Sequence, residues 1–261
     1  MVQDIDPVYF LGPLVSFGFS VVLVLFWAFK RRFSGSVLLY SLVAYSGAIA
    51  LKYVIQIPTA KAFTNSFGAS SVATGLYYGA QTMFLEVGLA YLVARFAVSR
   101  DKFTADDGEG YGIGLSFWEN GVLLGLLSLV SLAADYTIIA GGSPSLSQQV
   151  YQQLLTAEPQ LFSPPLQALP SIGLGILERI SSTLLHFSWG YLTLMAAFFR
   201  RRSLLFLALP MGLVDSLVPF AGALSVPVFE AIVFVLALIC LIVSLASTKA
   251  LRKKVIGREA P

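Results

Sequence analysis

Four residues able to do acid–base or metal chemistry lie inside segments that are otherwise apolar. They are the glutamates Glu86 and Glu119, the chain's single histidine, His186, and the aspartate Asp215. Carboxylates and imidazoles are the groups that bind zinc and that move protons in hydrolytic sites. A carboxylate at the centre of a bilayer costs about 2.5 to 3.5 kcal/mol on insertion scales, so each of these groups must face protein or trapped water rather than lipid.

The composition indicates that lipid is the surrounding solvent. Of the 261 residues, 57% are hydrophobic and 12% are charged, and the mean hydropathy is +0.80. This balance excludes an ordinary soluble domain and predicts an all-α, polytopic membrane helix bundle. One cysteine, Cys240, allows no internal disulfide. Seven transmembrane spans are expected, at about 8–29, 35–56, 71–94, 111–139, 171–199, 203–219 and 226–248.

The basic residues follow every second span. Apart from Lys61, the loops on the opposite side carry no lysine or arginine. The positive-inside rule therefore predicts an external N-terminus and a cytoplasmic C-terminus. The start MVQDIDP is acidic, unlike the basic start of a signal peptide, so we expect the first span to be retained in a single integral membrane domain, residues 1–261. The basic residues that follow these spans are Lys30, Arg31, Arg32, Arg95, Arg100, Lys102, Arg200, Arg201, Arg202, Lys249, Arg252, Lys253, Lys254 and Arg258.

The depth of each ionisable group follows from the helical rise of about 1.5 Å per residue, counted from the nearest basic loop. Glu86 and Glu119 come out roughly 11 to 14 Å inside the cytoplasmic boundary, and His186 and Asp215 about 20 Å, all within the hydrocarbon. A second group comes out near the outer interface, roughly 28 to 36 Å from the inner boundary, where long side chains reach water. Its members are Lys52, Asp135, Glu178, Arg179 and Glu230.

The four deep groups are expected to converge on a shared polar interior. One interpretation is a hydrogen-bonded network that fixes helix register, and the other is a catalytic or ion-handling site. Arg179 and His186 are seven residues apart and share a helix face. We expect Arg179, which follows Glu178, to reach Asp215 on the next helix, either as a structural ion pair or as part of an anion site.

Small residues near Glu119 predict close helix packing around that interior. Gly112, Gly114, Gly121 and Gly125 would let a neighbouring backbone approach the segment that carries the acid.

The external segment 141–170 contains a predicted surface helix. Ser143 is a capping residue, Pro144 suits the first turn, and Pro159 ends the helix. Leu146, Val150 and Leu154 fall on one face. The helix either lies flat on the outer leaflet or serves as a lid or docking surface, and Trp27 is expected to add exposed aromatic surface for another subunit.

Three segments resemble, in order and type, the YhfC-like membrane peptidases, which are relatives of the CAAX prenyl endopeptidases and the PrsW proteases. The segments are FLEVGLAYLVARF (84–96), YGIGLSFWENG (111–121) and ERISSTLLHFSWG (178–190). Glu178 and Arg179 followed by His186 are similar to the family's last motif, and Glu119 matches the acid that closes its glycine-rich second motif. The resemblance covers the third to fifth helices and implies a peptidase-like seven-helix layout in the cell membrane of a prokaryote.

Two motifs depart from the family pattern. Leu85 precedes Glu86 where the family has an adjacent acid, and Leu89 and Leu115 stand where it has an arginine and a histidine. These losses favour a non-catalytic scaffold or complex subunit, as in the related scaffold subunit of gamma-secretase. In that case we expect no cofactor. The alternative is an intramembrane metallo-endopeptidase that cleaves a transmembrane or membrane-proximal peptide. A transporter or proton path ranks last, because the two halves show no matching broken segments.

For a peptidase, the resemblance and the residue types imply a zinc site. Glu86 would act as the base while His186 and Glu119 bind metal or stabilise an oxyanion, or all three would bind zinc and leave the remaining carboxylate chemistry to Asp215. No short pattern such as H-E-x-x-H accompanies them. The expected partners are the lipid bilayer and other membrane subunits, and nucleic acid is not expected.

Overall fold

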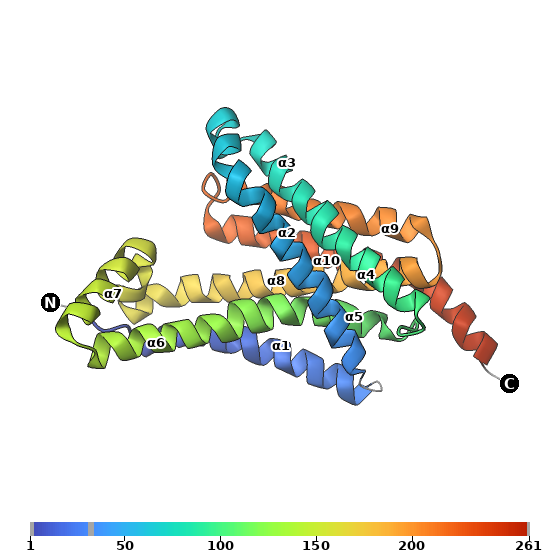
Figure 1. The fold of residues 1–261 in the computed structure, drawn as a ribbon, viewed down its shortest axis with the longest axis horizontal. Coiled ribbons are helices and arrows are strands. Elements are labelled where there is room, and N and C mark those ends of the chain that lie inside the picture. The colour runs from blue at the N-terminus through green and yellow to red at the C-terminus, as the bar shows by residue number, and fades with distance from the viewer. Residues whose placement is uncertain (1–2, 31–33, 260–261) are drawn as a thin grey trace.

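A computed structural model of the chain describes residues 3–30 and 34–259 (Figure 1). Arg31 and Arg32 of the first basic loop lie outside these residues, as do the side chains of the basic residues from Arg252 onward. Throughout the described residues the chain is helical or in turns, with no strand, as the apolar composition predicts.

The helices follow one another with short connections. The α-helices are α1 (Leu11–Lys30), α2 (Gly35–Phe67), α3 (Val72–Gln81), α4 (Gly88–Ser99), α5 (Asp107–Ser116), α6 (Ser128–Gly141), α7 (Pro144–Ala157), α8 (Pro165–Phe198), α9 (Arg202–Ala208) and α10 (Val226–Glu259). Tighter 3₁₀ segments are η1 (Pro7–Phe10), η4 (Pro159–Phe162) and η5 (Leu209–Phe220). Two wider π-helical segments, η2 (Thr82–Val87) and η3 (Phe117–Leu127), continue α3 into α4 and α5 into α6.

Six helical segments within the described chain are long and apolar enough to cross a membrane. They agree with six of the expected spans, although α2 runs 11 residues further than residue 56, to Phe67. The seventh expected span, 171–199, falls in α8, which has 34 residues but does not reach the same apolar content. The count of seven and the orientation of the termini stay predictions. The six segments are Pro7–Lys30, Gly35–Phe67, Val72–Ser99, Asp107–Gly141, Arg202–Phe220 and Val226–Lys249.

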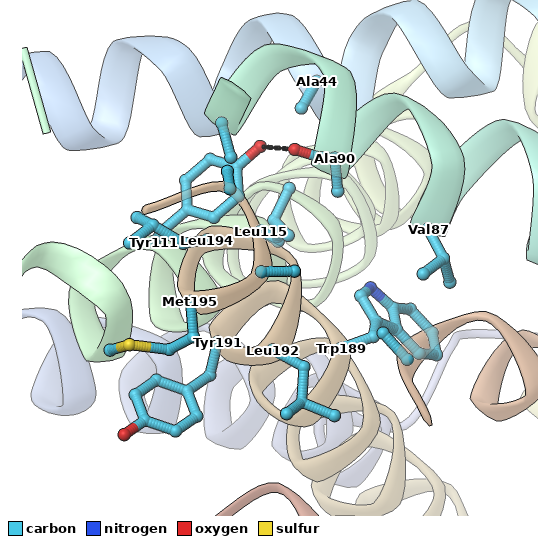
Figure 2. Packing of buried hydrophobic residues seen from close by; sticks show 14 of the residues in the cluster. Ala44, Val87, Ala90, Tyr111, Leu115, Trp189, Tyr191, Leu192, Leu194 and Met195 are labelled. Atoms are coloured by element: carbon cyan, nitrogen blue, oxygen red, sulfur yellow. Dashed lines mark hydrogen bonds between the residues drawn. The ribbon is translucent and has the colours of Figure 1, made fainter. Parts of the chain in front are cut away.

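Other helices of the protein surround the second half of α8. From Tyr191 to Ala197 every residue is buried, and the helix packs against α4, α5, α9 and α10. Figure 2 shows Tyr191, Leu192 and Met195 within the resulting hydrophobic cluster. In the same cluster the Tyr111 hydroxyl donates a hydrogen bond of 2.8 Å to the Ala90 carbonyl oxygen, joining α5 to α4.

Glycine allows α5 and α8 to cross with their backbones in contact. A Cβ atom on Gly190 would lie 2.7 Å from the Cα of Gly112, and one on Gly112 would lie 2.6 Å from the carbonyl oxygen of Phe187. Both distances are shorter than real side chains tolerate. The expected close approach along the glycine-rich segment is therefore present, and it holds Glu119 of η3 beside α8.

Helix α7 packs against the rest of the protein at the end of the molecule where the N-terminus lies (Figure 1). It begins at Pro144 after Ser143, as expected, although the Ser143 side chain makes no capping hydrogen bond. Val150 and Leu154 contact a second cluster of buried residues, whereas Leu146 is 43% exposed. The buried members of this cluster are Ile5, Tyr9, Leu132, Ile139, Leu161, Phe162 and Ala168.

The expectation that Trp27 is exposed is wrong. Its side chain is 1% exposed, because the indole ring packs directly on the backbone of Gly110. A Cβ atom at Gly110 would lie only 2.0 Å from the ring. The absence of a side chain at Gly110 thus creates the space that the Trp27 ring fills between α1 and α5.

A substitution at the α5–α8 crossing tests this packing. Changing Gly190 to alanine inserts a methyl group where the neighbouring backbone already lies, and overpacking of this kind costs about 1 to 3 kcal/mol. The matched control is Gly173→Ala on the same helix, where a Cβ would meet nothing within 4 Å. We expect the free energy of unfolding in detergent micelles to fall for Gly190→Ala only; equal losses in both variants would contradict the crossing.

Candidate metal centre

Three separate elements bring Glu86, Glu119 and His186 together. Glu86 lies on η2, Glu119 on η3 and His186 on α8. The Nε2 atom of His186 lies 2.7 Å from Oε2 of Glu119 and 3.4 Å from Oε2 of Glu86. One ligand atom from each residue lies within 4.8 Å of the others, a spacing that a single metal ion can span. The two glutamates and the histidine singled out in the sequence thus share one buried cluster.

Both acids are carried by π-helical segments. A π-helix closes its hydrogen bonds over five residues instead of four, so it turns the following side chains away from the α-helical phase. Glu86 and Glu119 are therefore aimed differently from what regular helices would give. Close contact keeps η2 in place, since a Cβ atom on Gly212 of η5 would lie 2.7 Å from the Met83 backbone.

The ring of His186 is oriented by its own helix. Its Nδ1 atom lies 2.9 Å from the carbonyl oxygen of Ser182. Because a carbonyl oxygen only accepts hydrogen bonds, Nδ1 carries the proton and donates it. This backbone contact leaves Nε2 as the atom directed at the two glutamates, which is the arrangement typical of a histidine that binds metal.

The environment of Nε2 fits a cation. Nε2 is buried and has no hydrogen-bond partner within the described part of the chain, although two carboxylate oxygens lie within 3.4 Å. Two carboxylates and an imidazole nitrogen repel one another at this distance unless a positive charge lies among them. One nitrogen and two oxygen donors are a donor set that zinc accepts. The residues present therefore fit a zinc ion.

Lys52 belongs to this cluster, contrary to the expectation that it lies at the outer interface. Its Nζ forms an ion pair with Oε1 of Glu86, lies 2.7 Å from Oγ1 of Thr82, and lies 3.7 Å from Oδ2 of Asp215.

The depth count started at Lys30, whereas α2 begins at Gly35. Counted from the helix ends, Lys52 is 17 residues from Gly35 and Glu86 is 13 residues from Ser99. At about 1.5 Å per residue the two positions differ by about 6 Å along the helices, which the lysine side chain spans. In the sequence, the one sign that Lys52 belongs to the site is its position inside an apolar span.

The expected ion pair between Arg179 and Asp215 is also wrong. Arg179 instead pairs with its neighbour Glu178, and its Nη1 lies 3.4 Å from Oδ1 of Asn120. Asp215 accepts a hydrogen bond from Thr82 and faces Lys52. The reason is that Asp215 is carried by the 3₁₀ segment η5, whose three residues per turn aim it toward η2 rather than toward α8.

Asn120 links Arg179 to the cluster. Its Nδ2 donates to the Ser182 hydroxyl at 3.0 Å, and that hydroxyl lies 3.5 Å from Oε1 of Glu119. Asn120 is fully buried. The polar network expected among these helices is therefore present and continuous with the Glu86–Glu119–His186 cluster.

Leu89 and Leu115, which stand where the family has an arginine and a histidine, are packed against neighbouring helices. Leu89 lies against α2, since a Cβ atom at Gly47 would be 2.9 Å from its δ-carbon, and Leu115 lies against Gly190 in the same way at 2.8 Å. Neither supplies a polar group. The cation beside Glu86 comes instead from Lys52 on α2.

A cavity of about 140 Å³ adjoins the cluster. Glu86, Glu119, His186 and Asp215 line it, and so do Glu178, Arg179 and Glu230. The expectation that Glu230 lies at a water-exposed interface is wrong, because its side chain is 6% exposed. A larger cavity of about 580 Å³ lies toward α7, and Asp135 is in its wall.

These features define a helical membrane protein with a buried cluster of two carboxylates and an imidazole able to bind metal. The chain belongs to the YhfC intramembrane metalloprotease family, whose model matches residues 15–244. No curated protein matches the chain. No solved structure matches it.

The charge balance around Lys52 gives a stability prediction. Replacing Lys52 by methionine leaves the carboxylates of Glu86 and Asp215 without their cation, and breaking a buried pair costs about 3 to 5 kcal/mol. We expect the unfolding free energy of the metal-free protein to fall by that order for Lys52→Met. Lys61→Met, at an exposed position on the same helix, is the control and should have little effect. If a Glu86→Gln substitution does not reduce the cost of Lys52→Met, the pairing is wrong.

Proposed function

We propose that the chain is an intramembrane metallo-endopeptidase that hydrolyses a peptide bond in a transmembrane or membrane-proximal segment. The observation that supports this best is the Nε2 atom of His186, which faces Glu86 and Glu119 without a hydrogen-bond partner among the described residues. A purely structural network would satisfy that nitrogen. The family to which the chain belongs agrees with this reading.

Glu86, Glu119 and His186 would hold the metal. Catalytic zinc sites take three protein ligands and keep one position for water or substrate. When bound, zinc supplies a Lewis acid that polarises a carbonyl oxygen and activates water. If Glu86 were the general base instead, only two protein ligands would remain, so the three-ligand assignment is the better of the two.

Asp215 is then the candidate general base. Its side chain is 37% exposed and lines the same cavity as the three ligands. In this role its carboxylate takes a proton from the attacking water and returns it to the leaving amine. The Thr82 hydroxyl donates to Oδ2 of Asp215, which orients the carboxylate.

Lys52 and Ser182 act as positioning residues. Lys52 binds Oε1 of Glu86, so that Oε2 is the atom that faces His186. The Ser182 carbonyl fixes the His186 ring through Nδ1. Both contacts orient the atoms that would bind the metal.

A non-catalytic scaffold is the second candidate. Leu89 and Leu115 occupy positions where related peptidases have polar groups, and both are packed among apolar neighbours. On this view the cluster would only join helices. The two candidates differ in whether a metal is bound and whether Asp215 matters for turnover.

Metal analysis separates them. We expect about one zinc per chain in the purified protein and loss of that zinc in Glu86→Gln, Glu119→Gln and His186→Ala, because each removes one of three ligands. Asp135→Asn, a carboxylate in the other cavity, is the control and should keep the metal. Metal-free wild-type protein that still folds and co-purifies with a partner would instead support the scaffold.

Turnover tests the role of Asp215. Asp215→Asn should retain zinc and lower the rate of peptide hydrolysis by about 10² to 10⁴, the usual contribution of a general base. Cleavage of a membrane peptide by reconstituted protein is the measurement. Unchanged turnover with full zinc content would exclude Asp215 as the base.

The larger cavity is the candidate route for water. Ser16, Ser131, Ser171 and Asp135 are polar members of its wall, and Glu178 and Arg179 line both this cavity and the smaller one. Hydrolysis within a bilayer needs such a supply. The Glu178–Arg179 pair would then separate the water-filled part from the metal centre.

Cysteine labelling tests the water route. In a Cys240→Ser background, Ser131→Cys should react with a charged, membrane-impermeant methanethiosulfonate reagent, because only a hydrated thiol ionises. Val130→Cys is the matched control at the adjacent position. The Val130 side chain is 58% exposed on the outside of the bundle and does not line the cavity. Equal labelling at both positions, or none at Ser131→Cys, would contradict a hydrated cavity.

A further inference from the structure

Glu230 is a buried carboxylate in the wall of the small cavity. Its side chain is 6% exposed, and Oε2 has no hydrogen-bond partner in the part of the chain that the structure describes. A buried carboxylate oxygen left unpaired costs more than a neutral group does, so such an atom calls for a donor.

Each of the other carboxylates around the small cavity lies beside a nitrogen of a lysine, arginine or histidine side chain. Among the described residues, Glu230 is the carboxylate in this wall that forms no ion pair. Glu86 and Asp215 share Lys52, Glu178 pairs with Arg179, and Glu119 faces Nε2 of His186. Glu230 is therefore the carboxylate of this wall that no basic side chain of the described residues neutralises.

The shape of the cavity limits what can supply the positive charge. Its volume is about 140 Å³, space for roughly five water molecules at about 30 Å³ each. That is below the roughly 300 Å³ at which pockets for drug-sized ligands begin, but it suits one long side chain. Apolar residues form the rest of the wall: Leu185, Trp189, Val214, Val218, Phe229 and Val233.

We propose that this cavity is a specificity subsite for a lysine or arginine side chain of the substrate, next to the bond that is cleaved, with the Glu230 carboxylate receiving the cationic end. The subsite rests on the proposed function. Apolar walls suit the methylene stem of a basic side chain, and the carboxylate suits its charged head. The candidate metal ligands line the same cavity. A substrate side chain held in this cavity would therefore place the substrate backbone beside the candidate metal centre.

A matched pair of metal-binding probes tests the subsite. Lysine hydroxamate and norleucine hydroxamate have the same methylene stem, and only the first carries an ammonium group. We expect zinc-loaded wild-type protein in micelles to bind lysine hydroxamate about tenfold more tightly, measured by calorimetry. In Glu230→Gln, norleucine hydroxamate should bind as before and the ratio should fall to about one.

A charge reversal and a control complete the test. Glu230→Lys should bind glutamate hydroxamate in preference to lysine hydroxamate, whereas Asp135→Asn should behave as wild type. Equal binding of the lysine and norleucine probes to wild type would overturn the subsite, with a water-solvated Glu230 as the explanation, and would leave the metal centre intact. If neither probe binds and no zinc is present, the proposed function fails and the subsite with it.

Discussion

The structure depends on bringing opposite charges together where neither water nor lipid can stabilise them. Glu86 and Asp215 share Lys52, and Glu178 pairs with Arg179 beside the same cavity. In a low-dielectric interior each of these charges is costly alone and is stabilised only by a near neighbour of the other sign. The segments that carry these side chains, α2, η2, η5 and α8, are thereby fixed relative to one another, and the candidate metal centre lies at their junction with η3.

Backbone geometry makes this junction possible. The α5–α8 crossing is close because Gly112 and Gly190 have no side chains, and two π-helical segments turn Glu86 and Glu119 inward. Each feature costs something in isolation, since glycine weakens a helix and π-turns bond less well. Such departures from regular structure are common where a site demands a particular side-chain direction.

The fold class and the core of the candidate site could be predicted from the sequence. Long apolar runs have one stable solution in a bilayer, and the high cost of Glu86, Glu119 and His186 in lipid required them to find polar surroundings. The places of Lys52 and Glu230 could not be predicted, because a count of residues from a basic loop shows neither where a helix begins nor which side chains its faces meet. The partner of Asp215 was mistaken for a related reason: a 3₁₀ segment such as η5 changes the direction of a side chain without any clear mark in the sequence.

The burial of α8 has a consequence for how the protein is made. Its mixed composition, with Glu178, Arg179, His186 and several serines, gives a nascent segment little tendency to leave the translocation channel for lipid by itself. Partner helices that emerged earlier, above all α4 and α5, provide the surface it needs. If α8 forms the predicted seventh span, its integration into the membrane requires these helices, and the bundle then assembles during membrane insertion rather than afterwards.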